Sequence, residues 1–432
     1  MTNKIIVDFD KIKGKIKPMH GVGQPPMIRL DFSMFEYLKE AKIPYSRLHD
    51  VAGPYGGYRF VDIPNLFRDF DADPFDPESY DFAFTDLLIT ALIENGVEPF
   101  FRLGVTIENN VSVKAYRVFP PKDNLKWAQI CEGVIRHYTE GWANGFHYDI
   151  EYWEIWNEPE GKQMWMGTQE EYFALYNTAS KYLKEKFPHL KIGGYASCGF
   201  YAIEKEYNAD FANIGKTVKY YYQYIQDFLK FVTENNCPLD FFSWHSYDSI
   251  PNNIHYAEHA RELLDNAGFH HTEQILNEWN LKPDLRGTFK HAALNGGMLL
   301  ALQDTDLSSA MFYDARCDVS IYSCMFNPLT REPFPTYYSF VAFSELYGRE
   351  NQVEVTAQIP GVYACAAKDS TGCLVVVNTT DEEVEYSLDV TKGYDTYQCK
   401  MLSETCLWEE TSVPEKLLPN SVVCFYFKQI EE

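Results

Sequence analysis

Two glutamates stand where apolar, strand-like segments of the sequence end. Glu158 lies near the end of Glu151-Tyr-Trp-Glu-Ile-Trp-Asn-Glu-Pro-Glu160, and Glu278 lies near the end of Gln274-Ile-Leu-Asn-Glu-Trp-Asn280. A pair of facing carboxyl groups can cleave a glycosidic bond, because one donates a proton to the leaving oxygen while the other attacks the anomeric carbon. The residue types and their positions therefore indicate acid/base and nucleophilic chemistry on a sugar.

The elements that must position these glutamates follow an alternating pattern between residues 17 and 348. Eight short apolar runs are predicted to be strands: Pro18–Val22, Tyr45–His49, Glu98–Leu103, Tyr152–Trp156, Lys191–Ala196, Phe241–Tyr247, Gln274–Glu278 and Ser309–Asp314. Eight amphipathic segments are predicted to be helices: Phe35–Ala41, Tyr80–Asn95, Leu125–Ala143, Thr168–Phe187, Thr217–Asn235, Ile254–Ala267, Lys290–Leu300 and Thr336–Tyr347. This alternation predicts a parallel sheet, and eight βα units are the number that closes a TIM barrel.

The spacing of the two glutamates fits this barrel. They are separated by 278 − 158 = 120 residues, which is about 40 residues for each of the three βα units between strands four and seven. Active sites of such barrels lie at the carboxyl ends of the strands. Strands four and seven lie across the mouth of the barrel from each other, so both carboxyl groups are expected to enter one cleft.

Two long connections follow the second and third predicted strands. They are Val51–Pro77, which contains Gly53-Pro-Tyr-Gly-Gly-Tyr58, and Val105–Asn124. Long βα loops lie at the face of the barrel that carries the active site. Their aromatic residues suit the walls of a pocket for a terminal sugar, and a structural lid is the alternative interpretation.

The sequence pattern changes after Tyr347. Short β-type runs separated by turn residues predict a small antiparallel β-sandwich: Val353–Val355, Val362–Ala367, Gly372–Asn378, Glu383–Val390, Tyr397–Met401 and Ser421–Lys428. The run Ile5–Phe9 has no place in the barrel and is expected to pair with this unit. The predicted fold class is therefore α/β, with a catalytic (β/α)₈ barrel at 17–348 and an appended sandwich at 1–16 plus 349–432.

The composition excludes several functional classes. The chain has 432 residues, of which 46% are hydrophobic and 16% aromatic, and this content predicts a folded globular protein. The 38 basic and 62 acidic residues give a net charge of −24, which disfavours nucleic acid and anionic membranes as partners. The ten cysteines form no Cys-x-x-Cys pair, so we expect buried, reduced thiols. No signal peptide is recognised at Met1, which predicts a cytoplasmic location, and the oligomeric state is left open.

The motifs together resemble those of retaining β-glycosidases, and within that clan the chain is most similar to glycoside hydrolase family 39, the β-xylosidase and α-L-iduronidase family. The resemblance rests on Trp-Asn-Glu-Pro at 156–159, the strand that ends at Glu278, Pro335-Thr-Tyr-Tyr-Ser-Phe340 and the terminal sandwich. It implies hydrolysis of terminal β-glycosidic bonds by double displacement, with an oligosaccharide or small glycoside as substrate. It implies no metal and no organic cofactor.

The resemblance also assigns roles to residues of this chain. Glu158 matches the general acid/base and Glu278 the nucleophile, while Asn157 matches the residue that hydrogen-bonds the sugar 2-hydroxyl. His245-Ser-Tyr247 resembles the His-x-Tyr of the clan, in which the tyrosine donates to the nucleophile. A phenol donor favours an ionised carboxylate. Core packing is the alternative role for both His245 and Tyr247.

Three further residues are expected to contribute to the site. On the second strand, Arg47 and His49 share parity and should point together into the barrel mouth. By resemblance, Arg47 holds the surroundings of the nucleophile and His49 binds sugar, whereas a buried ion pair between Arg47 and Glu154 is the alternative. Trp279, directly after the nucleophile, is expected at the rim of the sugar site.

One departure from the clan pattern weakens the substrate assignment. Many clan members place a tryptophan on strand eight, whereas Ser309-Ala-Met-Phe-Tyr-Asp-Ala-Arg316 offers Phe312 or Tyr313. A uronidase or arabinosidase would need a basic residue in the pocket, for which Arg316 and Arg102 are the candidates, and a salt bridge with Asp314 or Asp318 is the alternative role of Arg316. A non-catalytic carbohydrate-binding protein is the third hypothesis.

Overall fold

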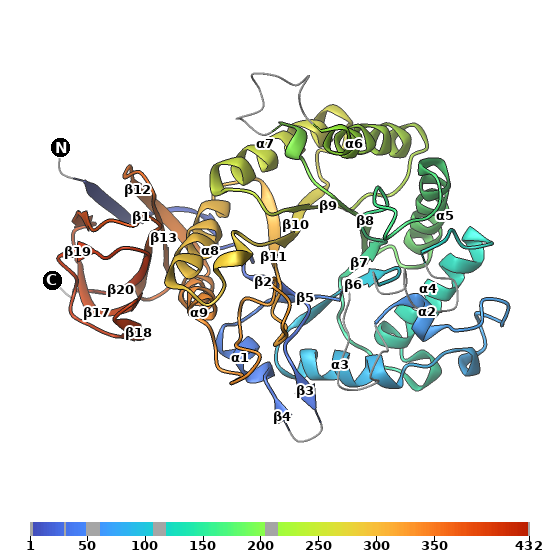
Figure 1. The fold of residues 1–432 in the computed structure, drawn as a ribbon, viewed down its shortest axis with the longest axis horizontal. Helices are drawn as coiled ribbons and strands as arrows, with labels where there is room; N and C mark the ends of the chain where they lie inside the picture. Colours follow the sequence, from blue (N-terminus) through green and yellow to red (C-terminus); the bar gives the residue numbers. More distant parts are fainter. Residues whose placement is uncertain (1–2, 30–31, 49–60, 107–117, 204–214, 431–432) are drawn as a thin grey trace.

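A computed structural model of the chain describes residues 3–29, 32–48, 61–106, 118–203 and 215–430. Its central feature is a closed barrel of eight parallel strands (Figure 1). In chain order these strands are β2 (Gly21–Gly23), β5 (Tyr45–Arg47), β6 (Glu98–Leu103), β7 (Tyr152–Ile155), β8 (Lys191–Ser197), β9 (Phe241–Ser246), β10 (Glu273–Trp279) and β11 (Leu307–Tyr313). The pairing of β11 with β2 closes the ring, so the predicted TIM barrel is confirmed.

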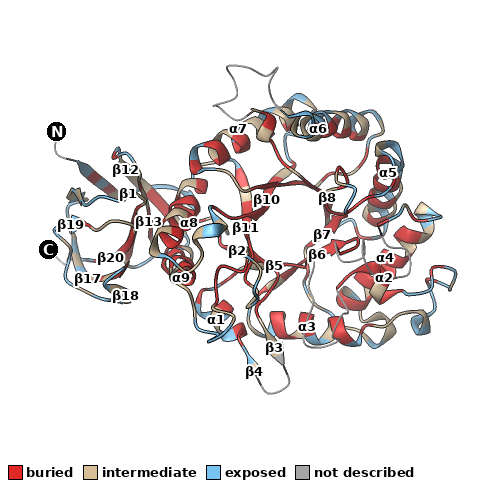
Figure 2. Ribbon diagram, in the orientation of Figure 1, coloured by how far each residue is buried: buried red, intermediate tan, exposed pale blue. Residues whose placement is uncertain are grey.

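Helices surround the barrel and bury the side that faces it (Figure 2). They are α1 (Phe35–Glu40), α2 (Ile63–Leu66), α3 (Ala83–Glu94), α4 (Asn124–Thr139), α5 (Gln169–Lys186), α6 (Lys216–Glu234), α7 (Ile250–Asn266), α8 (Phe289–Leu302) and α9 (Pro335–Tyr347). The short α2 lies inside the connection that was predicted after the second strand. A two-stranded hairpin, β3 (Ile28–Arg29) with β4 (Phe32–Ser33), precedes α1.

Local capping residues determine where several of these helices begin. The hydroxyl of Thr168 accepts the main-chain N–H of Glu171 at 3.2 Å, and the Glu171 carboxylate accepts the N–H of Thr168 at 2.7 Å. Ser249 and Thr288 cap α7 and α8 in a similar way. Such bonds satisfy N–H groups that have no partner within the helix.

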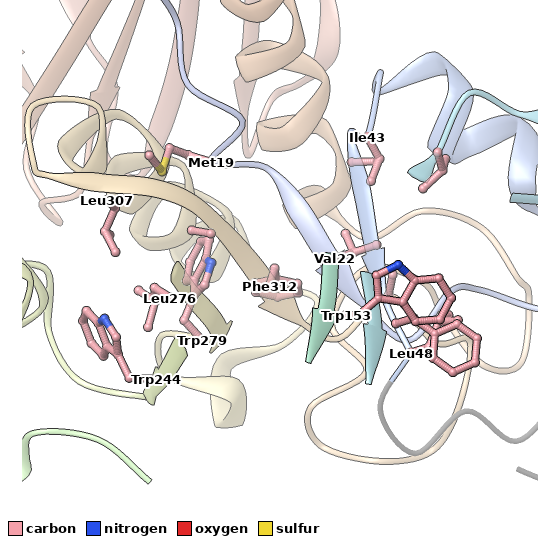
Figure 3. Packing of buried hydrophobic residues seen from close by; sticks show 14 of the residues in the cluster. Met19, Val22, Ile43, Leu48, Trp153, Trp244, Leu276, Trp279, Leu307 and Phe312 are labelled. Atoms are coloured by element: carbon pink, nitrogen blue, oxygen red, sulfur yellow. The ribbon is translucent and has the colours of Figure 1, made fainter. Parts of the chain in front are cut away.

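The interior of the barrel is apolar at its base. Phe100, Tyr152, Phe241, Ile275 and Met311 form this layer, each from a different strand. Because successive side chains of a strand point to opposite faces, the neighbouring residues pack outward against the helices. Figure 3 shows Leu276, Trp279 and Phe312 in this outer layer.

The second unit is one eight-stranded sheet in the order β16-β1-β12-β13-β14-β20-β17-β18, joined by a β15–β19 ribbon. Its strands are β1 (Lys4–Lys15), β12 (Asn351–Ala357), β13 (Val362–Lys368), β14 (Gly372–Asn378), β15 (Val384–Glu385), β16 (Ser387–Val390), β17 (Tyr394–Ser403), β18 (Cys406–Glu410), β19 (Lys416–Leu417) and β20 (Ser421–Gln429). The strands are antiparallel apart from β1 and β16. The predicted sandwich class is confirmed, whereas the run 383–390, predicted as one strand, is split because β15 pairs with β19 and β16 with β1.

The two faces of this sheet have different partners. On β14, Cys373 and Val375 belong to the core shared with the barrel, whereas Leu374 and Val376 belong to a separate cluster that includes Phe9 of β1. Helices α8 and α9 lie between the barrel and the sheet (Figure 1). On this basis we propose the domain division at 17–348 and 1–16 plus 349–432.

Among the described residues, no helix combines the length and the apolar character that a membrane-spanning helix requires.

Replacing Phe340 by alanine tests the contact between barrel and helices. Its ring is fully buried, 5.3 Å from that of Phe312 and 6.4 Å from that of Trp279 between centroids. We expect Phe340→Ala to lower the free energy of unfolding by about 3–5 kcal/mol, because it removes buried area and leaves a cavity. Leu329→Ala is the control, since Leu329 is 89% exposed. Equal shifts of the denaturation midpoint would contradict this account of the core.

Candidate active site

The structure brings the two predicted glutamates together at the mouth of the barrel. Glu158 follows β7, and Glu278 lies on β10, three strands further round the ring. One carboxylate oxygen of each glutamate and a ring nitrogen of His245 all lie within 4.8 Å of one another. A carboxyl separation of about 5–5.5 Å is typical of glycosidases that retain configuration, whereas inverting enzymes need roughly 6.5–9.5 Å.

A β-bulge in β10 aims Glu278 into the cleft. The register against β9 pairs Leu276 with Trp244 and Glu278 with His245, so Asn277 is an extra residue. Both Asn277 and Glu278 therefore face the barrel interior, where alternation alone would place only one of them. Asn277 donates to Glu154 at 2.5 Å, which fixes the bulge from inside.

Arg47, at the end of β5, connects the groups of the site. Its guanidinium donates to Glu154 Oε2 at 2.8 Å, to Asn157 Oδ1 at 2.6 Å and to Glu278 Oε2 at 3.3 Å. The side chain is 1% exposed. The two roles considered for Arg47 are therefore compatible, because it forms a buried ion pair with Glu154 and also contacts Glu278. Its donors are committed to protein groups rather than directed at a sugar.

Glu154 is the fully buried carboxylate with which Arg47 pairs in this network. Besides the bond from Arg47, its Oε1 accepts the hydroxyl of Ser243 at 2.6 Å and the amide of Asn277 at 2.5 Å. A buried carboxylate is tolerated when it is paired and its lone pairs are satisfied. Glu154 is fully buried beneath the two glutamates of the cleft and is satisfied in this way.

Glu278 is held by a phenol and a guanidinium. Tyr247 donates to its Oε1 at 2.5 Å, while Arg47 lies at Oε2. Burial raises the pKa of Glu278 above its usual value and the neighbouring Glu158 adds to this rise, while His245, Arg47 and Tyr247 act in the opposite direction. Burial also raises the pKa of Tyr247, with the Glu278 charge adding to the effect, so this tyrosine remains a donor. These neighbours favour the ionised form of Glu278 against the cost of its desolvation.

Glu158 is the more open of the two carboxyl groups. Its side chain is 31% exposed, against 9% for Glu278. Burial raises its pKa to about 7, with Arg47 and a hydrogen bond from the Cys198 thiol acting in the opposite direction. A carboxyl group that titrates near neutral pH can both give up and accept a proton there, as acid/base catalysis requires.

The backbone of the loop after β7 is fixed against β8. Glu158 has a positive φ of 42°, and its N–H donates to the carbonyl of Ala196 at 3.0 Å. The buried carboxylate of Glu160 accepts from the Ser197 hydroxyl at 3.0 Å and from the Cys198 N–H at 3.2 Å. Burial raises the pKa of Glu160 to about 8. Glu160 and Cys198 were not identified from the sequence, although Glu160 lies two residues beyond Glu158 in the same motif.

His245 and Asn157 complete the group that the structure brings together. His245 Nδ1 lies 2.8 Å from Glu158 Oε1 and 3.6 Å from Glu278 Oε2. Burial lowers the pKa of His245 to about 4, so the imidazole is neutral at pH 7. Asn157 accepts from Arg47 through its Oδ1, which orients its amide NH₂.

The structure places Trp279 elsewhere than expected from the sequence, and it does not describe His49. Trp279 is fully buried, with its ring between Phe312 and Phe340, so it is a core residue and not a rim contact. The physical reason is alternation, since the residue after the inward-facing Glu278 points outward. His49 lies outside the described residues, as do all of residues 49–60 and 107–117 in the two long connections.

The last barrel strand, β11, carries no tryptophan, and Tyr313 at its end and Tyr322 in the following connection lie near the site. Phe312 is fully buried in the outer core. The ring centroid of Tyr322 lies 5.7 Å from that of Tyr313 and 5.3 Å from that of Tyr247. Arg316 donates to Asp314 at 2.8 Å and 3.0 Å, which confirms the salt-bridge alternative. Arg102 is fully buried and donates to the carbonyl of Val105.

Glu158, His245 and Glu278 are also the groups that could ligate a cation in the described part of the chain. A metal ion at this position would lie close to the Arg47 guanidinium, which contacts Glu278. The repulsion between these charges disfavours a divalent cation.

Comparison with known proteins agrees with this arrangement. Residues 57–278, more than half of the chain, match the model of glycosyl hydrolases family 39. The chain belongs to this family. The predicted family is therefore confirmed, and the protein is an O-glycoside hydrolase that acts on a carbohydrate substrate.

Curated relatives of this family 39 enzyme include two proteins named "Beta-xylosidase". One, from Geobacillus stearothermophilus, is 24% identical over 388 residues, 76% of this chain and 69% of that protein. The other, from Caldicellulosiruptor saccharolyticus, is 26% identical over 337 residues, 69% of this chain and 64% of that protein, so the match spans less than two thirds of its length. Among solved structures, a glucosidase from Croceicoccus marinus has a TM-score of 0.79 at 20% identity, with all of both chains covered.

Replacing Arg47 by methionine tests the network beneath the site. We expect Arg47→Met to lower the free energy of unfolding by about 3–5 kcal/mol, because it leaves the buried carboxylates of Glu154 and Glu278 without their cation. Arg136→Met is the matched control, since Arg136 forms an exposed pair with Glu140 whose loss should cost at most about 1 kcal/mol. Chemical denaturation measures both, and similar losses would contradict the central role of Arg47.

Proposed function

We propose that this family 39 enzyme is a retaining β-xylosidase-like glycosidase that removes terminal sugars by double displacement. The observation that carries the proposal is the approach of Glu158 and Glu278 to within 4.8 Å in surroundings that differ. Glu158 is partly exposed and titrates near neutral pH, whereas Glu278 is buried and held by Arg47 and Tyr247.

The difference in environment supports the following division of roles. Glu158 is protonated when substrate binds and gives its proton to the departing glycosidic oxygen, while the Glu278 carboxylate attacks the anomeric carbon and forms a covalent glycosyl ester. Glu158, now ionised, then takes a proton from water as that water attacks the same carbon. The ester breaks, Glu278 is released as a carboxylate, and the sugar leaves with its original configuration.

The neighbouring residues position these groups. Tyr247 and Arg47 each bind one oxygen of Glu278, which orients the carboxylate toward the sugar. The Asn157 amide, oriented by Arg47, donates to the sugar 2-hydroxyl, a contact that strengthens in the transition state. His245, which is neutral, bridges from Glu158 toward Glu278 without adding a charge.

The preference for a β-xyloside rests on the relatives named "Beta-xylosidase". The uronidase alternative is less well supported, because the Asp314 carboxylate already neutralises Arg316. A non-catalytic binding protein would have no need for a carboxyl pair at bonding distance from one sugar. A panel of 4-nitrophenyl glycosides tests the sugar: the β-xyloside should have the highest kcat/KM, and preference for a glucuronide or a β-glucoside would contradict the assignment.

Paired variants of the two glutamates test the assigned roles. Glu278→Ala should lower turnover by about 10⁴-fold, and added azide should restore part of it by forming a glycosyl azide of inverted configuration. Glu158→Gln should slow alkyl xylosides by roughly 10²–10⁴-fold, but activated aryl xylosides much less, because a good leaving group needs little protonation. Nuclear magnetic resonance of the azide product identifies its anomer. An equal loss on both substrate types would contradict the acid role of Glu158.

The pH profile provides an independent test of Glu158. Its pKa is raised to about 7 and the acid must be protonated in the free enzyme, so kcat/KM should fall as the pH rises through about 7. The Cys198 thiol lowers this pKa, so Cys198→Ala should move the alkaline limb to higher pH. Steady-state rates between pH 5 and 9 (roughly two pH units on each side of 7), on an alkyl xyloside whose cleavage needs the Glu158 proton, measure the alkaline limb of both proteins. If the alkaline limb of the kcat/KM profile lies at lower pH in Cys198→Ala than in the wild type, this account is contradicted.

A further inference from the structure

A second cavity lies next to the active site, where the barrel meets the β-sandwich. Its volume is about 260 Å³, and it is lined by Tyr247, Asp248, Leu281, Lys282, Leu294 and Tyr363, among others. The first four belong to the loops that follow β9 and β10, Leu294 belongs to α8, and Tyr363 belongs to β13 of the sandwich. Sites for drug-sized ligands have volumes of about 300–1,000 Å³, so this smaller cavity suits a single sugar ring.

The cavity is linked to the catalytic centre by Tyr247. The hydroxyl of this residue donates to Glu278, and the residue also lines the second cavity. Lys282 lies four residues after Glu278, in the connection that follows β10. Tyr247 is therefore a common neighbour of the catalytic carboxylate and of this cavity.

Tyr363 of the sandwich can line the cavity because α8 has a glycine, Gly297, at the point of contact. A Cβ atom at Gly297 would lie 2.9 Å from Tyr363 Cδ2, 3.0 Å from Thr379 Cγ2 and 3.3 Å from Ile250 Cδ1. Glycine within a helix costs about 1 kcal/mol relative to alanine. Here it allows Tyr363 to approach the α8 backbone, and the ring of Tyr363 lines the cavity.

Two polar groups of the cavity have no protein partner. In the part of the chain that the structure describes, neither the Lys282 ammonium nor the Tyr363 hydroxyl makes a hydrogen bond or an ion pair. Among the described residues the neighbouring Asp248 forms no ion pair with Lys282; its carboxylate accepts from the Ser249 N–H at 2.6 Å, Asn252 Nδ2 at 3.0 Å and the Tyr256 hydroxyl at 2.7 Å.

We propose that this cavity, formed jointly by the barrel and the sandwich, is a subsite for a sugar of the leaving group. An apolar floor with an aromatic ring and a few hydrogen-bond donors is the usual composition of a small-ligand site. Leu281, Leu294 and Tyr363 contact the apolar faces of the pyranose, and Lys282 donates to its hydroxyls. The assignment to the leaving group rests on the proposed function, because an enzyme that removes terminal sugars holds the rest of the chain on the leaving side.

The test compares a long substrate with a short one. For each variant we measure kcat/KM on xylotetraose and on methyl β-xyloside, whose leaving group has no ring to fill the cavity, and we take the ratio of the two. Tyr363→Ala should lower this ratio about five- to tenfold, and Lys282→Gln about threefold, which is the effect of losing one or two modest contacts. Xylobiose and xylotriose then show at which chain length the defect begins.

A matched control separates binding from folding. Tyr397→Ala removes another tyrosine of the same sheet, one that is 48% exposed and does not line the cavity, so its ratio should equal that of the wild type. If Tyr363→Ala lowers both rates equally, its role is structural and the subsite proposal is overturned. An unchanged ratio in Tyr363→Ala overturns it as well.

Failure of the proposed function has a separate signature. It would be a lack of xyloside hydrolysis by the wild-type enzyme, whatever residue stands at 363. The ratio is then measured with the methyl glycoside and the oligosaccharide of whichever sugar the wild type does cleave, and the expected effect of Tyr363→Ala is the same.

Discussion

Three acceptors at the barrel mouth share the guanidinium of Arg47, and the arrangement of the site depends on this sharing. These acceptors are the carboxylates of Glu154 and Glu278 and the amide oxygen of Asn157. Arginine suits this position because its donors form a rigid planar fork and its charge is permanent. A buried guanidinium also needs anionic partners, so the cation and the carboxylates stabilise one another's burial. The site is therefore part of the barrel interior and not an addition to its surface.

The same network gives two identical functional groups different properties. Glu278 is almost completely buried, with a phenol and a guanidinium at its oxygens, whereas Glu158 is partly open and has a neutral imidazole beside it. Environments that separate two carboxyl groups in this way are how a single site supports both acid and nucleophile. The sandwich packs on α8 and α9 and contributes Tyr363 to the cavity that Tyr247 also lines.

Much of the fold was predictable from the sequence for simple reasons. The eight strands and their helices follow from hydrophobic periodicity, and Ile5–Phe9 was expected to pair with the sandwich because it had no place in the barrel count. The spacing of Glu158 and Glu278 predicted that they would share a cleft. The first barrel strand was less accurately placed, since β2 covers only Gly21–Gly23. Strand β18 was missed because it is short and largely exposed, and β19 because it has only two residues.

By itself, the sequence determined the class of chemistry and the residues that end the fourth and seventh strands, because these depend on local pattern and on spacing along the chain. Only the tertiary structure decided which side chains meet. The bulge at Asn277 aims Glu278 inward and Trp279 outward, although strict alternation from Ile275 would give the opposite result. The roles of Glu160 and Tyr363 also depend on segments distant in the sequence, since burial and hydrogen bonding are set by neighbours in space.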